Sequence, residues 1–233
     1  MVSRRNWLLR SALDGGRDRR VNVKVTDVNH PIFARLYSRI VLPAMARQGA
    51  EDLRRRTLAG LAGTVVEVGA ADGANFSLYP DEVERIVAIE PEPFLRERAS
   101  GHADERVELR DAAADALPVG DGEADAVVFT LVLCSVEQPH AALAEAQRVL
   151  RPGGELRFLE HVHAAQPGAA RAVQRALDAT VWPRLFGGCH LARDTAAAIE
   201  ESGFTLTEIE HLSFPEGAGP FTADAILGRA VPA

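Results

Sequence analysis

Short, β-branched apolar stretches alternate with helical stretches over most of the 233-residue chain. The stretches typical of buried strands lie at residues 64–68, 85–89, 106–110, 125–132, 155–159, 204–211 and 221–228. Helical stretches separate them at residues 93–100, 139–150, 169–179 and 194–202, the second of which is followed by Pro152-Gly153-Gly154. Strands that alternate with helices pair in parallel through right-handed crossovers. The pattern therefore predicts an α/β fold with a doubly wound, mostly parallel, seven-stranded sheet.

The chain before the first predicted strand has a different pattern. Apolar residues from Ile32 to Ile40 fall on one helical face, and a second helix is predicted over residues 51–61. We expect these helices to form a cap, residues 29–62, on a single domain that spans residues 29–233. Residues 1–24 carry seven basic and two acidic residues without an apolar period, so residues 1–28 are predicted to form a disordered basic tail.

Charge and composition narrow the class of function. The formal net charge is −7, and the acidic body disfavours a nucleic-acid groove. Lys24 is the single lysine, which disfavours a Walker phosphate loop and a Schiff-base enzyme. Cys134 and Cys189 lack the spacing of a zinc motif or a disulfide framework, so a reducing, cytoplasmic compartment is expected and a metal is not. No apolar run reaches the roughly 20 residues that span a bilayer, so stable membrane insertion is not expected.

The first predicted strand leads into a loop that contains two glycines, Glu67-Val68-Gly69-Ala70-Ala71-Asp72-Gly73-Ala74-Asn75. Ligands of doubly wound sheets bind beyond the carboxyl ends of the strands, where this loop lies. Gly69 and Gly73 permit a tight turn and a close approach of the backbone to a ligand. Alanines replace the second and third glycines of the dinucleotide-binding pattern, which disfavours NAD. Taken alone, the loop fits a ligand site or an ordinary strand-to-helix turn.

Acidic residues follow the next two predicted strands. Glu90 and Pro91 end the second strand, where a carboxylate can accept hydrogen bonds from both hydroxyls of a ribose. The loop after the third strand offers an acid and backbone amides that can bind an adenine edge. This order predicts a ligand that contains adenosine. The candidate cofactor-binding residues are Glu67, Gly69, Ala71, Gly73, Asn75, Glu90, Pro91, Asp111, Ala114, Asp115, Leu131 and Cys134.

These motifs, and the chain from about residue 29 to residue 228, resemble the class I methyltransferases that use S-adenosylmethionine. Glu67-x-Gly69-x-Ala71-x-Gly73 resembles the acidic glycine loop of that family, and Arg148 to Gly154 resembles the segment before its fifth strand. Residues 130–136, 160–162 and 177–195 resemble the alkyl-thiol S-methyltransferases and their bacterial relatives. The resemblance implies the Rossmann-like methyltransferase fold and S-adenosylmethionine as cofactor. It also implies a small, apolar acceptor, with a thiol favoured over oxygen, nitrogen or carbon acceptors.

The sequence departs from that family at three points. Ala71 stands at the middle glycine, and its methyl group narrows the room for the methionine part of the cofactor. Ala113 stands where many relatives have Asp, so Asp111 or Asp115 is expected to bind the adenine amino group. We expect no membrane anchor of the kind that the animal thiol enzymes have, and the expected protein is soluble.

Methyl transfer from a sulfonium is an in-line displacement, in which positioning supplies much of the acceleration. A thiol with a pKa of about 8.5 needs little help from a base, whereas a hydroxyl or a carbon acid needs more. The candidate bases are His161 and His190, with Glu160 oriented toward His161. Each histidine fits a packing role as well.

The region between residues 177 and 195 is expected to cover the site. Trp182, Leu185 and Phe186 either line an apolar acceptor pocket or belong to the core. Cys134 and Cys189 are interpreted as small buried residues rather than nucleophiles. We also hypothesise that residues 29–45 fold over the strand ends as a lid, which brings His30 and Tyr37 near the acceptor.

The sequence leaves two other functions open. One is an NAD-dependent oxidoreductase on the same fold, and the other is a catalytically inactive protein that binds an adenosyl ligand. The expected partner is a small-molecule acceptor, and the expected state is a monomer or a homodimer.

Overall fold

The computed structural model describes residues 49–164, 168–180, 182–214 and 223–233. The predicted basic tail, the helix at residues 32–40 and the lid with His30 and Tyr37 lie outside the described residues.

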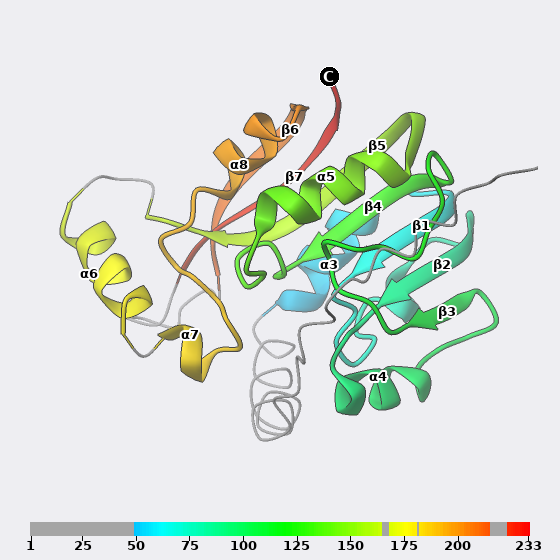
Figure 1. The fold of residues 1–233 in the computed structure, drawn as a ribbon, viewed down its shortest axis with the longest axis horizontal. Coiled ribbons are helices and arrows are strands. Elements are labelled where there is room, and N and C mark those ends of the chain that lie inside the picture. Colours follow the sequence, from blue (N-terminus) through cyan, green and yellow to red (C-terminus); the bar gives the residue numbers. More distant parts are fainter. Residues whose placement is uncertain (1–48, 165–167, 181, 215–222) are drawn as a thin grey trace, which may run out of the picture.

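One sheet of seven strands runs through the molecule in the order β3-β2-β1-β4-β5-β7-β6 (Figure 1). Its strands are β1 (Gly63–Val68), β2 (Val83–Ile89), β3 (Val107–Arg110), β4 (Ala124–Thr130), β5 (Leu150–Val162), β6 (Phe204–Phe214) and β7 (Ala223–Pro232). The first five strands pair in parallel, whereas β7 is antiparallel to both β5 and β6. The predicted doubly wound, mostly parallel sheet is confirmed.

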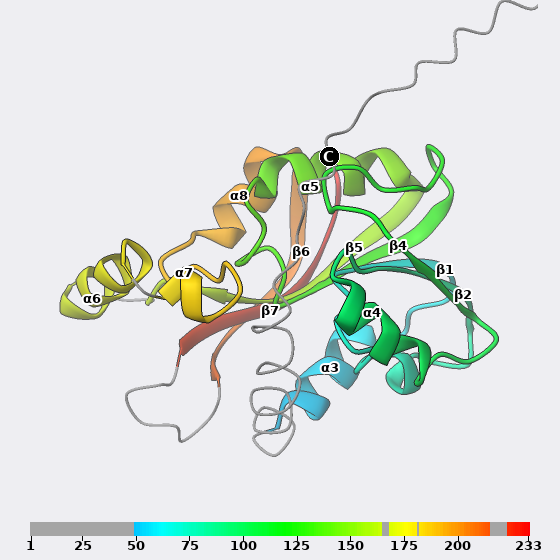
Figure 2. The same ribbon diagram turned by 60° about the horizontal axis from the view of Figure 1, so that its bottom comes forward.

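Helices cover both faces of the sheet (Figure 2). The described helices are α3 (Ala50–Leu58), α4 (Pro93–Ser100), α5 (Pro139–Val149), α6 (Ala169–Asp178), α7 (Trp182–Leu185) and α8 (Thr195–Glu201), with a 3₁₀ turn, η2 (Phe76–Leu78). Helices α5 and α8 lie over one face, and α3 and α4 over the other. Helices α6 and α7 lie to one side of the sheet in both views, and no residue of α6 is buried.

Neighbouring residues of the central strands pack into opposite layers. Val66 of β1 belongs to the cluster under α5 and α8, whereas Val65 packs with Leu58 and Phe76 on the other face. Successive side chains of a strand point to opposite faces, and a central parallel strand is covered on both. This is why these strands are apolar at nearly every position.

Most predicted boundaries are confirmed within a few residues, and α4 shows why. Pro93 occupies the first turn, and the Glu92 carboxylate accepts a hydrogen bond from the Leu95 amide at 2.8 Å. The largest difference is in β5, which begins at Leu150 instead of residue 155. Leu150 pairs with Ala124, so the Pro152-Gly153-Gly154 stretch is an irregularity at the start of the strand and not only a helix stop.

Within the described part of the chain, no helix combines the length and the apolar character needed to cross a membrane.

Candidate active site

The loop after β1 turns sharply because two of its glycines adopt left-handed backbone conformations. Gly69 has φ +73° and Gly73 has φ +84°. A Cβ atom on Gly69 would lie 2.5 Å from Cγ2 of Val132, which follows β4. Both positions therefore require glycine, and Gly69 brings the loop directly against the turn after β4.

Ala71 lies at the tip of this loop and also has a positive φ, +50°. A residue with a Cβ is strained in this conformation. Its amide donates a 2.8 Å hydrogen bond to Oε2 of Glu90 at the end of β2. The position therefore favours glycine for its backbone as well as for ligand space.

A buried polar network lies beneath the loop. Oε1 of Glu67 accepts a hydrogen bond from Asn75 at 2.9 Å, and Oε2 accepts one from the Tyr79 hydroxyl at 3.0 Å. Asn75 also donates to Thr130 and accepts from Arg54. Burial raises the pKa of Glu67 to about 7, against the lowering effect of these partners. Glu67 and Asn75 are buried beneath the loop, with 2% and 1% of their surface exposed, so their side chains support the loop from below.

Glu90 connects the loop to the second strand. One carboxylate oxygen accepts from the Ala71 amide and the other from the Glu92 amide at 2.9 Å. Burial raises the pKa of Glu90, although both amides lower it. The structure thus places a buried carboxylate beside the glycine loop, and its role as a ribose acceptor stays a prediction. Pro91 follows, and its carbonyl accepts from Arg96 at 3.1 Å.

The loop after β3 is more open. Asp111 forms a 2.9 Å ion pair with Arg96, and its side chain is 61% exposed. Asp115 is exposed, whereas Ala114 is partly buried against the core. Asp111 and Asp115 therefore remain accessible to an adenine edge, and the structure does not favour one over the other.

The turn after β4 is held by Glu160, which is fully buried. Its carboxylate accepts from the amides of Val132, Leu133 and Cys134 at 2.8, 3.0 and 3.0 Å. Burial raises the pKa of Glu160, against the effect of these amides. The carboxylate of Glu160 therefore fixes this turn, and its predicted orienting effect on His161 stays a prediction.

Leu131 begins this turn. It has φ +58°, and its amide donates to the carbonyl of Leu159 at 2.7 Å. A non-glycine residue held in this conformation at the end of a central strand is typical of a site whose backbone is fixed by its surroundings.

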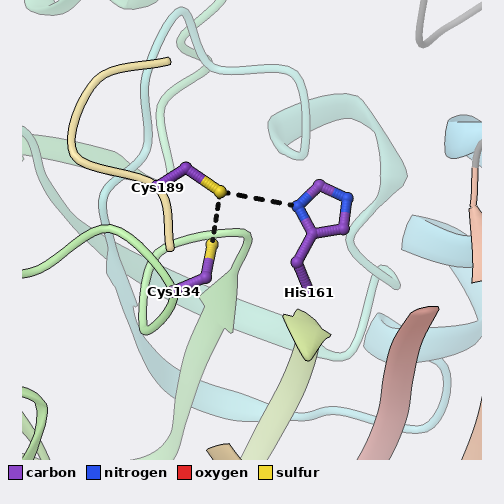
Figure 3. Close-up of side chains that lie close together, drawn as sticks. All are labelled: Cys134, His161 and Cys189. Atoms are coloured by element: carbon purple, nitrogen blue, oxygen red, sulfur yellow. Dashed lines mark hydrogen bonds between the residues drawn. The ribbon is translucent and has the colours of Figure 1, made fainter. Parts of the chain in front are cut away.

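Cys134, His161 and Cys189 come together on the far side of the same turn (Figure 3). Sγ of Cys189 lies 3.8 Å from Sγ of Cys134 and 3.9 Å from Nδ1 of His161. The contact between the thiols raises the pKa of Cys134, as does burial, while the same contact lowers the pKa of Cys189. No local motif predicts this cluster, because its residues come from three separate segments of the chain.

The segment from residue 186 to residue 193 is fixed onto the turn after β4 by backbone contacts. The His190 amide donates to the carbonyl of Cys134 at 2.8 Å. Gly188 has φ +87°, and a Cβ there would lie 2.7 Å from the carbonyl oxygen of Ser135. Arg193 donates to the carbonyls of Leu133 and Val136. These contacts place Cys189 against Cys134.

His190 lies outside the sulfur cluster. Its Nδ1 is 3.9 Å from Oδ2 of Asp178, and its side chain is 39% exposed. Trp182 and Phe186 stack with ring centroids 4.0 Å apart, and Phe186 is 36% exposed. Phe186 therefore lies at the surface of the region, and neither ring belongs to the main core clusters. The side chain of Leu185 lies outside the described residues.

A hollow of about 450 Å³ lies at the opposite ends of the strands from the glycine loop. Its lining includes Gly60, Asp125, Arg151 and Arg229. It borders the start of β1 and β4. Because ligands of this fold bind at the carboxyl ends of the strands, we assign the site to the glycine loop and not to this hollow.

Comparison with known proteins agrees with this geometry. Residues 66–158 match the model of the family described as a methyltransferase domain. The chain is 38% identical over 174 residues to the thiol S-methyltransferase TMT1B of Rattus norvegicus. This aligned region covers 72% of this chain and 70% of the relative. It is 38% identical over 158 residues to the thiol S-methyltransferase TMT1A of Homo sapiens, covering 65% and 64%. A solved geranyl diphosphate methyltransferase in complex with S-adenosylmethionine has the same fold, with a TM-score of 0.62, 14% identity and coverage of 86% and 90%.

Proposed function

We propose, from the premise that this chain belongs to the thiol S-methyltransferase family of S-adenosylmethionine-dependent methyltransferases, that its acceptor is the thiol of a small, apolar molecule. The observation that carries the proposal is the similarity of this chain to a thiol S-methyltransferase. The two sequences are 38% identical over 70% of that relative's length. The methyltransferase domain and the relatives favour methyl transfer over an NAD-dependent oxidoreductase.

The site supports a thiol for a second reason. Glu160 is the carboxylate nearest in sequence to His161, and its oxygens are already engaged by three backbone amides. Such a carboxylate is a poor base for a hydroxyl or a carbon acid, which require a strong one. A thiol ionises near neutrality with little help.

The residues at the carboxyl ends of the strands fit the adenosyl cofactor. The buried carboxylate of Glu90 suits the ribose hydroxyls, and the backbone between Gly69 and Gly73 turns closely enough for the methionine part to approach. Asp111, Ala114 and Asp115 border the adenine, while Leu131 and Cys134 border the methyl group. When bound, the cofactor supplies an electrophilic methyl group on a sulfonium.

The chain's own contribution is to position the two reactants and exclude water. The Glu160 carboxylate fixes the turn that separates the cofactor loop from the segment at residues 186–193. His190, beside Asp178, is the better placed of the two histidines to accept a proton from an incoming thiol, since its side chain is partly exposed. Holding the reactants in line accounts for most of the acceleration, as much as about 7–11 kcal/mol of barrier.

A matched acceptor panel tests this proposal. Purified protein is incubated with S-adenosylmethionine labelled in its methyl group and with pairs of acceptors that share a carbon skeleton, one carrying a thiol and the other a hydroxyl or amine. The expected result is label transfer to the thiols alone. Transfer to the alcohol or amine partners would contradict the thiol assignment, and cofactor binding without any transfer would identify an inactive adenosyl-ligand-binding protein.

We place this activity in the cytoplasm and assign it to a monomer or homodimer that does not bind nucleic acid. Both cysteines are free thiols in the structure, and the formal net charge is −7. Size-exclusion chromatography coupled to light scattering measures the oligomeric state, and an oligomer larger than a dimer would contradict this assignment.

A further inference from the structure

The cluster of Cys134, His161 and Cys189 has the dimensions of a metal site. The two sulfurs are 3.8 Å apart, Cys189 Sγ lies 3.9 Å from Nδ1 of His161, and the three atoms all lie within 4.8 Å of one another. Around a tetrahedral zinc ion with bonds of about 2.3 Å to sulfur and about 2.0 Å to nitrogen, the sulfurs lie about 3.8 Å apart and each lies about 3.5 Å from the nitrogen. The observed spacing is within a few tenths of an ångström of these values for the two measured pairs.

The surroundings of His161 point independently to a ligand. Its Nε2 atom is buried and has no hydrogen-bond partner among the residues that the structure describes. Its Nδ1 atom lies 3.9 Å from the Cys189 sulfur, which is a weak contact (Figure 3). The imidazole therefore has a weak contact at Nδ1 and none at Nε2 among the described residues, so its proton can stay on Nε2 while Nδ1 is free to bind an ion.

We propose that Cys134, Cys189 and His161 bind a zinc ion through their two Sγ atoms and Nδ1, with a fourth coordination position left for another ligand. Thiolate and imidazole ligands suit zinc, and three protein ligands are typical of sites that accept a further ligand. Both thiols release their protons to water on binding. The two thiolates then balance the charge of the ion, so the buried site carries no net charge with a neutral imidazole.

The fold holds the ligands in place before an ion arrives. Glu160 fixes the backbone of Cys134 through its amide, and the His190 amide fixes the carbonyl of the same residue. Gly188 lets the segment with Cys189 approach the turn closely enough for the sulfurs to meet. The three ligands are separated in the sequence, which explains why spacing alone predicts no zinc motif.

The role of this site rests on the proposed function. The fourth position takes the sulfur of the acceptor as a thiolate, whose proton His190 accepts and passes to water. A lone pair of that sulfur forms a bond to the methyl carbon while the bond from carbon to the sulfonium breaks, and its electrons remain on the cofactor's sulfur. The products are a neutral thioether and S-adenosylhomocysteine.

Metal binding is tested directly on the full chain. The protein is reduced, stripped with a chelator, and titrated with Zn²⁺ alone and then with Co²⁺, whose bonds to thiolates give a charge-transfer band in the near ultraviolet. The expected result is one metal per chain with that band. C134S, C189S and H161Q should each weaken binding by about tenfold or more, whereas H140Q, at an exposed histidine outside the cluster, should not.

Uptake of less than one metal by the reduced wild-type chain, or uptake without a thiolate band, would overturn the proposal even if a variant fails to fold. Unchanged binding in a C134S and C189S double variant would do the same. The acceptor panel gives a separate answer. If the chain methylates thiols but binds no metal, the zinc site alone is refuted. If the chain binds metal but methylates no thiol, the proposed function alone is refuted.

Discussion

The cofactor side of the molecule, residues 67–117, and the acceptor side, residues 131–136, 160–163 and 182–194, satisfy their buried polar groups differently. On the cofactor side, Glu67 and Glu90 each have both carboxylate oxygens paired. On the acceptor side, Nε2 of His161 and Nε1 of Trp182 are buried without a hydrogen-bond partner in the described ranges. Asp72 is the counterexample, since one of its oxygens on the cofactor side is unpaired.

The contrast separates two ways to build a site. The cofactor side is a self-supporting scaffold, in which the loop is fixed by hydrogen bonds to neighbouring strands. The acceptor side is assembled from distant segments, and its sulfur and imidazole atoms contact one another weakly. Buried groups that lack protein partners are costly unless a ligand supplies them. Substitutions on one side should therefore leave the other side largely intact.

The largest expected effect is a pH dependence of stability from Glu67. Its pKa is raised from 4.5 to about 7 in the folded chain, so between these pH values the folded state keeps a proton that the unfolded state gives up. The stabilisation is complete below pH 4.5 and is lost as the pH rises through about 7. Between pH 5 and pH 8, the free energy of unfolding of the wild type should fall by about 2–3 kcal/mol relative to that of Glu67→Gln. Denaturant unfolding at both pH values measures this difference.

Glu97→Gln, an exposed position on α4, serves as the control and should follow the wild-type curve. If the difference in stability between Glu67→Gln and wild type is the same at both pH values, the network under the loop does not hold a protonated carboxyl group.

Gly188→Ala should damage the acceptor side. The substitution forces a Cβ to 2.7 Å from the Ser135 carbonyl at φ +87°, and we expect a loss of about 2 kcal/mol in the free energy of unfolding. Gly153→Ala is the matched control, because Gly153 has φ +82° with no atom within 4 Å and carries only the backbone strain of about 1 kcal/mol. Chemical denaturation compares the two.

Thiol turnover should fall further in Gly188→Ala than in Gly153→Ala, while the affinity for S-adenosylhomocysteine stays near wild type in both. Equal stabilities of the two variants would show that segment 186–193 does not pack on the turn as described.

Glu90→Ala should damage the cofactor side. Removing a charged acceptor of the ribose hydroxyls weakens binding of S-adenosylhomocysteine by about tenfold or more, about 1.4 kcal/mol, measured by titration calorimetry well below the melting temperature. Glu97→Ala should bind normally. An unchanged affinity in Glu90→Ala would place the ribose elsewhere.

Ala71→Gly has the smallest expected effect, and it should stabilise the folded state where the other substitutions weaken stability or binding. Glycine relieves the strain of φ +50°, so the free energy of unfolding should rise by up to about 1 kcal/mol, partly offset by the greater freedom of the unfolded chain. Cofactor affinity should stay the same or increase. A clearly weaker affinity would show that the Ala71 methyl group contributes a contact to the cofactor.

The two sides also differ in how well the sequence predicts them. Strand and helix positions follow from local patterns, as at Pro93, where a capping acid and a proline mark the start of α4. The loop from Gly69 to Gly73 and the acid at Glu90 were expected at the strand ends. Their exact contacts were not, because the pairing of Glu67 with Tyr79 depends on side chains that meet only after folding.

The acceptor side was predicted less well for a physical reason. Cys134, His161 and Cys189 are 27 and 28 residues apart in sequence, and no helical or strand period brings them together. Their meeting depends on Glu160 holding one turn and on Gly188 letting another segment approach it. Such long-range contacts leave no periodic signal, and for the same reason the bonds from Glu160 to the turn after β4 were not predicted.

The central claim is that the acceptor side carries the thiol chemistry separately from cofactor binding. Cys189→Ser tests it most directly, with the dissociation constant of S-adenosylhomocysteine and the kcat/KM for a small thiol measured on the same preparation. The account predicts a dissociation constant within about twofold of wild type and a fall in kcat/KM of about tenfold or more. Parallel losses of both, or unchanged turnover, would contradict it.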